Sequence, residues 1–205
     1  MEPAQPLDVR TRILQAAVGL LAEHGVSELT QPKVARAAGV RQSHLTYYFP
    51  TRADLLLAVA AHSIEALTSG MASAARDGTL TQETLAPALA AAVSDKRRAR
   101  VMLGLVVTAD EDRQLKERFR EFVEVIRGRI GALLAQLGLT VDPATLAACH
   151  TMLVGAAMLN LARDDAAARQ ELQAVTRLIV ERVLGAAAAP APTTRPRLRG
   201  KGGAR

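Results

Sequence analysis

Apolar residues recur along this chain with the period of an α-helix rather than that of a strand. The first stripe follows the spacing i, i+3, i+4, i+7, i+8 and consists of Ile13, Ala16, Ala17, Leu20 and Leu21. Residues with this spacing share one face of a helix. Similar stripes follow in later segments, whereas no window alternates apolar and polar residues with β-branched enrichment. The pattern predicts an all-α protein of about nine helices.

Capping residues, glycines and prolines divide the pattern into separate helices. We expect helices over residues 9–23, 31–38, 42–48, 51–75, 82–94, 96–109, 111–137, 143–162 and 166–187. Thr51 and Asp54 have the spacing of a capping box, and side chains such as Asp8 and Thr30 can cap earlier helices. Breaks are expected at Asp110 and at the glycine that follows each of several helices.

The composition excludes some classes of protein and leaves others open. Cys149 is the only cysteine, so an intrachain disulfide and a cysteine-based metal cluster are excluded. No stretch approaches the roughly 18 consecutive apolar residues of a membrane span. Residues 1–6 lack the basic and apolar regions of a secretion signal. We therefore expect a cytoplasmic protein that is not membrane-bound and needs no cofactor or metal.

The net charge of +6 is distributed unevenly. Residues 1–52 carry +2, residues 53–185 carry −1 and residues 186–205 carry +5. The high pI therefore reflects the Pro-, Thr-, Arg- and Gly-rich end of the chain, which we predict to be a disordered basic tail over residues 188–205. Its arginines either add non-specific affinity for DNA or play no part in binding.

Residues 30–52 have the pattern of two short helices joined by a tight glycine turn. Gly39 can supply the positive φ that the turn requires. Val34 and Leu45 give the two helices apolar faces toward each other, which leaves one face of the second helix exposed. This is the arrangement with which a helix-turn-helix enters the major groove of DNA.

The side chains on the second of these helices suit contact with DNA. Gln42, Ser43 and His44 lie near its N-terminus, where they can reach base edges. Hydroxyl and basic groups suited to phosphate oxygens are contributed by Thr46, Tyr47, Tyr48, Arg10, Arg12, Lys33 and Arg52. Phe49 fits a core position, Tyr48 fits core and interface equally, and His44 could also be a solvated surface residue.

These segments together resemble the DNA-binding domain of the TetR family of bacterial regulators. The resemblance covers residues 12–57 without a gap, and it is carried by Ile13–Ala17, Leu20–Gly25, Thr30, Val34–Val40, Leu45, Tyr48-Phe49 and Thr51–Leu56. It implies that Thr30 and the hydroxyls of the third helix contact phosphates and that Arg52 replaces the usual lysine. It also implies a homodimer on a palindromic operator that is released when a small molecule binds the C-terminal domain.

The sequence departs from the family's pattern at three positions. Arg41 stands where a serine or threonine usually caps the third helix, Thr46 replaces the usual tyrosine, and Pro50 follows Phe49. Arg41 can then make a phosphate or guanine contact instead of capping. With the resemblance, the expected domains are a helix-turn-helix domain over residues 1–50 and a helical ligand-binding and dimerisation domain over residues 51–187.

The second domain is aliphatic and holds only two aromatic residues. Residues that could line a pocket there are His62, Met71, Met102, Val106, Phe119, Phe122, Val123, Cys149, Met152 and Asn160. Methionines suit an adaptable apolar ligand, and no acidic cluster indicates a cationic one. We hypothesise a hydrophobic ligand that is neutral or weakly anionic.

The last two helices have the composition of a dimer interface. Small residues allow close approach and apolar residues supply contact area, and the candidates are Leu146, Leu153, Gly155, Ala156, Leu172, Val175, Ile179 and Val183. Two such helices from each subunit would form a four-helix interface.

Several other interpretations compete with these. Cys149 and His150 could suggest a nucleophile and its base, but adjacent residues on a helix point about 100° apart, so core or pocket roles are favoured. The basic residues from Lys96 to Arg100 are interpreted as a solvated helix face. An enzyme with an accessory DNA-binding domain is disfavoured because no general-base pair, phosphate-binding loop or metal set occurs. A DNA-binding architectural or constitutive regulator without an effector stays open.

Overall fold

The computed structural model describes residues 8–25 and 28–185, apart from the side chain of Val183. Within these ranges the chain is helical and contains no strand, which confirms the all-α prediction. The helices are α1 (Val9–His24), α2 (Gln31–Ala37), α3 (Gln42–Tyr48), α4 (Arg52–Arg76), α5 (Gln82–Val93), α6 (Lys96–Glu111), α7 (Arg113–Gln136), α8 (Pro143–Arg163), α9 (Ala166–Leu178) and the short π-helical segment η2 (Ile179–Leu184).

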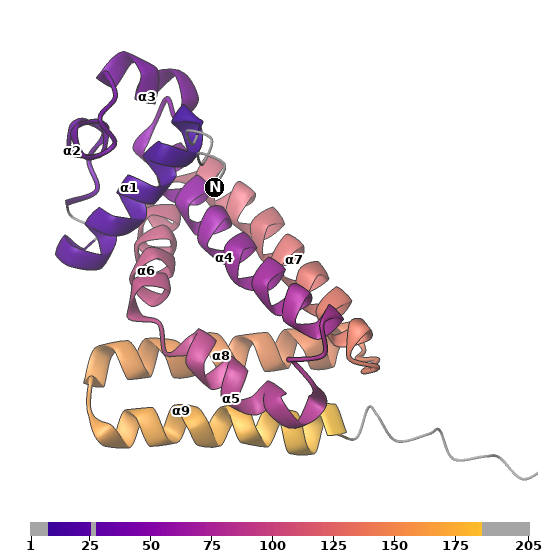
Figure 1. Ribbon diagram of the computed structural model, residues 1–205. Coiled ribbons are helices and arrows are strands. Elements are labelled where there is room, and N and C mark those ends of the chain that lie inside the picture. Colours follow the sequence, from indigo (N-terminus) through magenta and orange to yellow (C-terminus); the bar gives the residue numbers. More distant parts are fainter. Residues whose placement is uncertain (1–7, 26–27, 186–205) are drawn as a thin grey trace, which may run out of the picture.

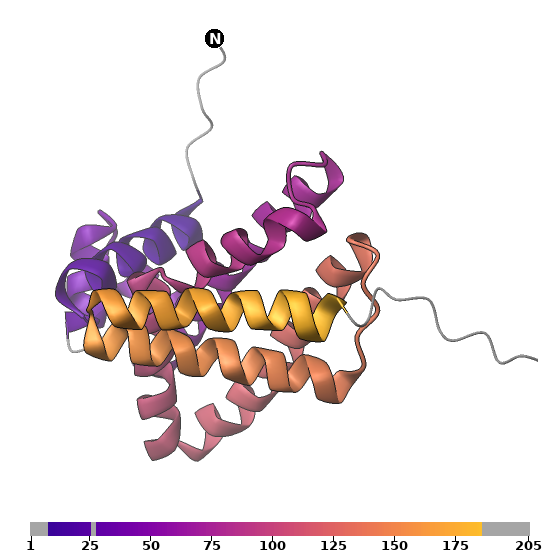
Figure 2. The ribbon, with the colours of Figure 1, turned by 90° about the horizontal axis from the view of Figure 1, so that it is seen from below.

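The helices form a wedge with a small head at one end. In Figure 1, α1, α2 and α3 make up the head, and α4, α6 and α7 run from the head toward α8 and α9. Figure 2 shows α8 and α9 side by side along the face opposite the head. The three long helices α4, α6 and α7 therefore connect the head to the α8–α9 pair.

Capping side chains fix most helix starts where the sequence predicts them. The Thr51 hydroxyl accepts a hydrogen bond from the Asp54 backbone N–H at 3.0 Å, and an Asp54 carboxylate oxygen accepts one from the Thr51 N–H at 2.9 Å. Asp8 caps α1 by accepting from the backbone N–H of Arg10 at 2.7 Å. The predicted capping box at the start of α4 is thus confirmed.

Three details of the predicted helices are wrong. Thr30 occupies the N-cap position of α2, but its side chain makes no capping hydrogen bond. The break between α6 and α7 lies at Asp112 rather than Asp110, because the Asp112 carboxylate caps α7 by accepting from the Leu115 N–H at 3.0 Å. The last helix is not α-helical throughout, since its backbone changes to π-helical geometry at Ile179. Residues 186–187 and the predicted tail lie outside the described residues.

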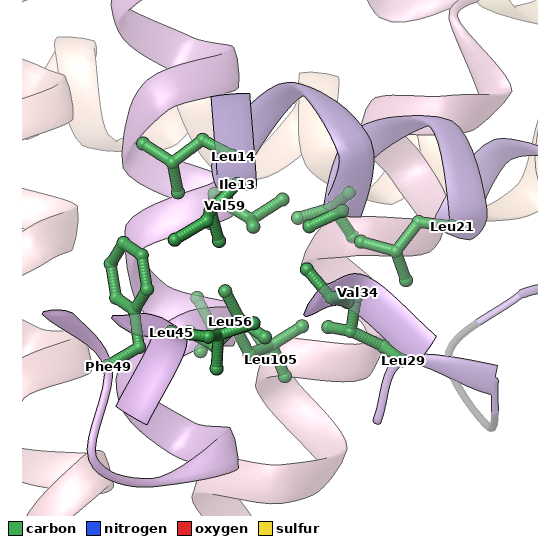
Figure 3. Packing of buried hydrophobic residues seen from close by; sticks show 14 of the residues in the cluster. Ile13, Leu14, Leu21, Leu29, Val34, Leu45, Phe49, Leu56, Val59 and Leu105 are labelled. Atoms are coloured by element: carbon green, nitrogen blue, oxygen red, sulfur yellow. The ribbon is translucent and has the colours of Figure 1, made fainter. Parts of the chain in front are cut away.

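One apolar core joins the head to the long helices. Figure 3 shows Leu45 and Phe49, at the two ends of the third-helix segment, pointing toward the same centre as Leu56 of α4 and Leu105 of α6. All four side chains are buried. Truncating a side chain of this kind to alanine costs about 2–5 kcal/mol in other proteins, so the core holds the head firmly against α4 and α6.

A second cluster of buried residues lies farther from the head. It joins α5, α7, α8 and η2 through residues that include Leu85, Leu134, Cys149 and Leu184. Ile130 of α7 packs against both clusters and so connects them. The two ends of the wedge are therefore in continuous side-chain contact.

Asp54 ties the start of α4 to α7, and we predict that this tie contributes to stability. One of its oxygens accepts a hydrogen bond from Arg118 Nη1 at 2.6 Å while the other completes the capping box. We expect Asp54→Ala to lower the free energy of unfolding at neutral pH by about 1–2 kcal/mol, the range for loss of a helix cap. Thermal and urea unfolding would measure the loss.

The same prediction has a pH dependence and a control. The Thr51 hydroxyl and then Arg118 lower the pKa of Asp54, so its contribution is complete above the carboxyl's ordinary pKa and disappears as the pH falls through the lowered value. The control is Asp110→Ala, because the Asp110 side chain is 81% exposed and pairs only with Lys116 among the described residues. Equal losses in the two variants would contradict the prediction.

Candidate nucleic-acid interface and ligand cavity

Helix α3 is exposed along nearly all of its surface. From Arg41 to Tyr48, every side chain except Leu45 is exposed, and Leu45 is fully buried. Tyr47 is the most exposed large apolar residue described, with 81% of its surface accessible. A seven-residue helix held by one buried leucine leaves the remaining side chains available to a partner.

The turn before α3 has the backbone geometry that the sequence predicts. Gly39 adopts φ +63°, which L-residues rarely adopt. Arg12 Nη2 donates to the carbonyl oxygens of Ala38 at 2.8 Å and of Gly39 at 3.1 Å. The Arg12 guanidinium, predicted from sequence to contact phosphate, therefore binds the turn and holds α1 against it.

The far end of α3 is fixed by a second set of contacts. Gln31 Nε2 donates to the carbonyl oxygens of Phe49 at 2.7 Å and of Pro50 at 3.1 Å. The Phe49 ring is buried, as predicted, and the guanidinium of Arg10 lies 5.7 Å from its centre. The Tyr47 and Tyr48 rings pack edge to face at 5.3 Å. Both ends of α3 are thus positioned by residues of the neighbouring helices.

The structure gathers most of the predicted DNA-contacting residues on one exposed surface. Gln42, Ser43, His44, Thr46 and Tyr47 lie together on α3, and Arg41 is exposed at its start. The Thr46 hydroxyl donates to the Gln42 carbonyl at 2.9 Å, so its proton is used within the helix.

The other predicted basic contacts are engaged with the head itself. Lys33 forms an ion pair with Glu28, and Arg52 Nε donates to the Leu29 carbonyl at 3.1 Å. The hydrogen bond places Arg52 against the segment that precedes α2. Replacing Arg52 would therefore disturb the fold of the head as well as any contact with a phosphate.

A cavity of about 180 Å³ lies between α4, α5, α6, α7 and α8. Its wall is almost entirely aliphatic and thioether groups, from residues such as Ile64, Leu89, Ile126, Leu153 and Met158. The polar side chains at its wall are Thr68, Asp95, Arg98, Cys149 and His150. An apolar cavity with few polar groups is typical of a site for a small ligand.

Three of the ten predicted pocket residues line this cavity, namely Met71, Met102 and Cys149. The structure places the other seven elsewhere, and they are His62, Val106, Phe119, Phe122, Val123, Met152 and Asn160. Core and pocket residues share the same periodic pattern, so the sequence does not separate them. The buried Asn160 side chain has an Oδ1 atom without a hydrogen-bond partner among the described residues.

Burial sets the ionisation of the cavity's two reactive side chains. Burial lowers the pKa of His150, with a further contribution from Arg127, so its neutral form is favoured. Burial raises the pKa of the Cys149 thiol, whereas a nucleophilic cysteine needs a lowered pKa. No group of three His, Cys, Asp or Glu residues in the described ranges could hold a metal ion.

The basic residues at the start of α6 are only partly a solvated face. Arg97 is exposed, as the sequence suggests. Arg98, however, lies at the cavity and donates to the Ala92 carbonyl at 2.8 Å. Arg100 Nη1 donates to the Ala22 carbonyl at 2.8 Å, which joins α6 to α1. Interpreting Arg98 and Arg100 as solvated is therefore wrong, because their hydrogen bonds are tertiary.

The predicted interface residues of α8 and α9 divide among three surroundings. Leu146 and Leu153 line the cavity. Gly155, Ala156, Leu172 and Val175 line a shallow groove on the outside of the α8–α9 pair, together with the exposed residues Met152, Leu159 and Leu178. Ile179 is buried in its own subunit, as is most of Leu172. The side chain of Val183 lies outside the described part of the structure.

Helices α4 and α8 are long and apolar enough, by length and composition alone, to cross a membrane. Both belong to the helical wedge, and α4 packs within its main core. Only 11% of the most apolar window of α8 is buried in the protomer. This helix therefore presents an apolar surface that neither α9 nor α5 covers.

Comparisons with known proteins agree with the head's geometry. Residues 13–59 match the family model of the bacterial regulatory proteins, tetR family. The HTH-type transcriptional regulator CymR of Pseudomonas putida is 28% identical over 146 residues, which are 67% of this chain and 71% of CymR.

Solved structures of regulators share the whole fold. A TetR transcriptional regulator from Rhodococcus sp. RHA1 has a TM-score of 0.61 at 19% identity, over 83% of this chain and 95% of that one. The multidrug binding protein EbrR, solved with ethidium, has a TM-score of 0.59 at 26% identity, over 85% and 99% of the two chains. With its exposed third helix, glycine turn and matching family model, this chain is a DNA-binding transcriptional regulator of the TetR family.

Proposed function

We propose that the protein is a homodimeric repressor that binds a palindromic operator and leaves it when a small apolar ligand enters the cavity. The observation that carries this proposal is the position of α6. Its first turns line the cavity through Arg98, Ala99 and Met102, while Val101 and Leu105 belong to the core of the head. One helix thus touches both the ligand site and the DNA-binding head.

The proposed DNA contacts follow from exposure on α3. Placed in the major groove, α3 presents Gln42, Ser43 and His44 to base edges near its N-terminus. Phosphate contacts are assigned to the surrounding hydroxyl and basic groups, which are Thr30, Thr46, Tyr47, Tyr48, Arg10, Lys33, Arg41 and Arg52. Arg12 acts on DNA binding indirectly, because it holds the turn that orients α3.

The proposed domains are those expected from the sequence, with residues 1–50 binding DNA and residues 51–187 binding the ligand and the second subunit. The exposed apolar groove of α8 and α9 is the proposed dimer surface. Pairing two such surfaces would bury the apolar side of α8 and give a bundle of four helices. A DNA-binding dimer with this ligand site would act in the cytoplasm.

The ligand would act by shifting the population of two arrangements of α6. A ligand changes a conformational equilibrium only as far as it binds one state better than the other. Filling the cavity displaces the first turns of α6, and the Arg100–Ala22 hydrogen bond passes that displacement to α1. The head would then turn away from the spacing that the operator requires. The ethidium complex of EbrR supports a small-molecule site in this part of the fold.

Selection of bound DNA from a random pool would test the proposal as a whole. We expect one palindromic sequence whose half-sites are about one helical turn apart, since a twofold dimer places two α3 helices in successive major grooves. Recovery of DNA without a shared sequence would favour an architectural role instead.

Replacing side chains of α3 and of its surroundings should separate base recognition from phosphate contact. We expect His44→Ala to change preference at one position of each half-site by about 1–3 kcal/mol. We expect Lys33→Gln to weaken binding to all sequences alike and to lower the salt slope by about 0.9 per site occupied. Fluorescence anisotropy on the selected operator, its single-base variants and unrelated DNA, at several salt concentrations, would measure both effects.

Two features make this pair informative. Both side chains are exposed, so neither substitution removes a buried contact, and unchanged thermal unfolding checks this. Arg52 is avoided because its hydrogen bond to Leu29 supports the fold of the head. A uniform loss of affinity in both variants would argue against the assigned division of roles.

A charge placed in the α8–α9 groove should prevent dimerisation. Leu159 lines the groove and is 57% exposed, so Leu159→Glu adds an unpaired charge to the proposed interface without disturbing the protomer's core. We expect the wild type to have the mass of a dimer by light scattering at micromolar concentration and this variant to have that of a monomer.

The matched control is Leu103→Glu, on α6 outside the groove, where the leucine is also exposed. This variant should remain dimeric. A monomeric wild type, or a dimeric Leu159→Glu variant, would rule out the proposed surface.

A further inference from the structure

The apolar cavity contains one buried cationic group that is only partly satisfied. We propose that the ligand is an apolar acid, whose carboxylate binds Arg98 while its hydrocarbon body fills the aliphatic part of the cavity. The inference rests on the proposed ligand-released function and adds the chemical class of the ligand.

Arg98 is held at the cavity wall by contacts that leave one donor unused. Its Nη2 donates to the Ala92 carbonyl at 2.8 Å, and its Nη1 lies 3.2 Å from Asp95 Oδ2. Its Nε is buried and has no hydrogen-bond acceptor among the described residues. Buried donors without acceptors are rare because desolvating them is costly, and a bound acceptor is one explanation for such a group.

Asp95 does not make the site suitable for a cation. Its Oδ1 caps α6 by accepting from the Arg97 backbone N–H at 2.9 Å, and it lies 3.4 Å from Arg97 Nε. Its other oxygen faces Arg98. Two guanidinium groups and the positive end of the α6 dipole therefore surround one carboxylate, which leaves the local balance positive.

The remaining polar groups at the cavity provide no competing charge. The Thr68 hydroxyl donates to the Ile64 carbonyl at 3.0 Å, so its proton is already used. Burial keeps Cys149 as a thiol and favours neutral His150. Arg98 is thus the one cationic donor that the described cavity residues offer to a ligand. A guanidinium is well matched to a carboxylate, which it can bind through two N–H groups.

The cavity volume limits the size of the acid. About 180 Å³ is slightly more than the roughly 150 Å³ of an engineered apolar cavity that binds benzene. The aliphatic wall, with Met71, Met102 and Met158, can adapt to a flexible chain. An acid with a chain of eight carbons is therefore a suitable probe.

Three probes with one chain and different head groups test the inference, and they are octanoate, 1-octanol and octylammonium. Titration calorimetry on the full-length protein should show octanoate binding at least tenfold more tightly than either of the others. Octanoate should also release the operator at a lower concentration. In Arg98→Met, octanoate should lose at least tenfold in affinity while 1-octanol binds as it does to the wild type, since the apolar cavity remains.

Two controls separate the possible results. Arg97→Gln removes a neighbouring exposed guanidinium that contacts the same Asp95, and it should leave octanoate binding unchanged. Equal binding of octanoate and 1-octanol, tighter binding of octylammonium, or octanoate affinity that is unchanged in Arg98→Met would overturn the acid inference while leaving a ligand-released regulator in place. Binding of none of the three probes, with no release of DNA, would count against both.

Discussion

The structure depends on a single apolar core that the head cannot form by itself. Helices α2 and α3 have seven residues each, and such helices are unstable alone because nucleation is costly. Leu45 and Phe49 become buried only because Leu56 of α4 and Leu105 of α6 complete the core around them. The DNA-binding surface is therefore built partly by helices that also border the ligand cavity. A change in α6 alters the support of α3 directly, without any further relay.

Arginines strengthen this joint at the places where the backbone would otherwise lack partners. Arg12 satisfies carbonyls in the turn before α3, Arg100 satisfies a carbonyl near the end of α1, and Arg118 binds the carboxylate that caps α4. Each of these bonds connects helices that are far apart in the sequence. Their charges are counted in the basic composition of the chain, although they act within the protein.

The sequence was sufficient for the helices and for the exposed side of α3, because periodicity, the glycine turn and the capping box are local signals. Gly39 and Thr51 act through their own backbone and nearest neighbours, so their roles are visible without a fold. The cavity is different. Met102 lines it while Phe122 is core, although both occupy apolar helix positions, since only the crossing of five helices decides which side faces the void. Arg98 was hidden for the same reason, because a basic run at a helix start resembles a solvated surface.

The apolar outer side of α8 also ties the protein's behaviour to its abundance. A surface of this kind is unfavourable in water, so its covered and uncovered forms are related by mass action, and the covered form gains weight as copies accumulate. Because two linked heads gain avidity on two half-sites, occupancy of a DNA site would rise more steeply than in proportion to the number of chains. The hydropathy of one helix thus makes the regulator's own concentration a variable in its response.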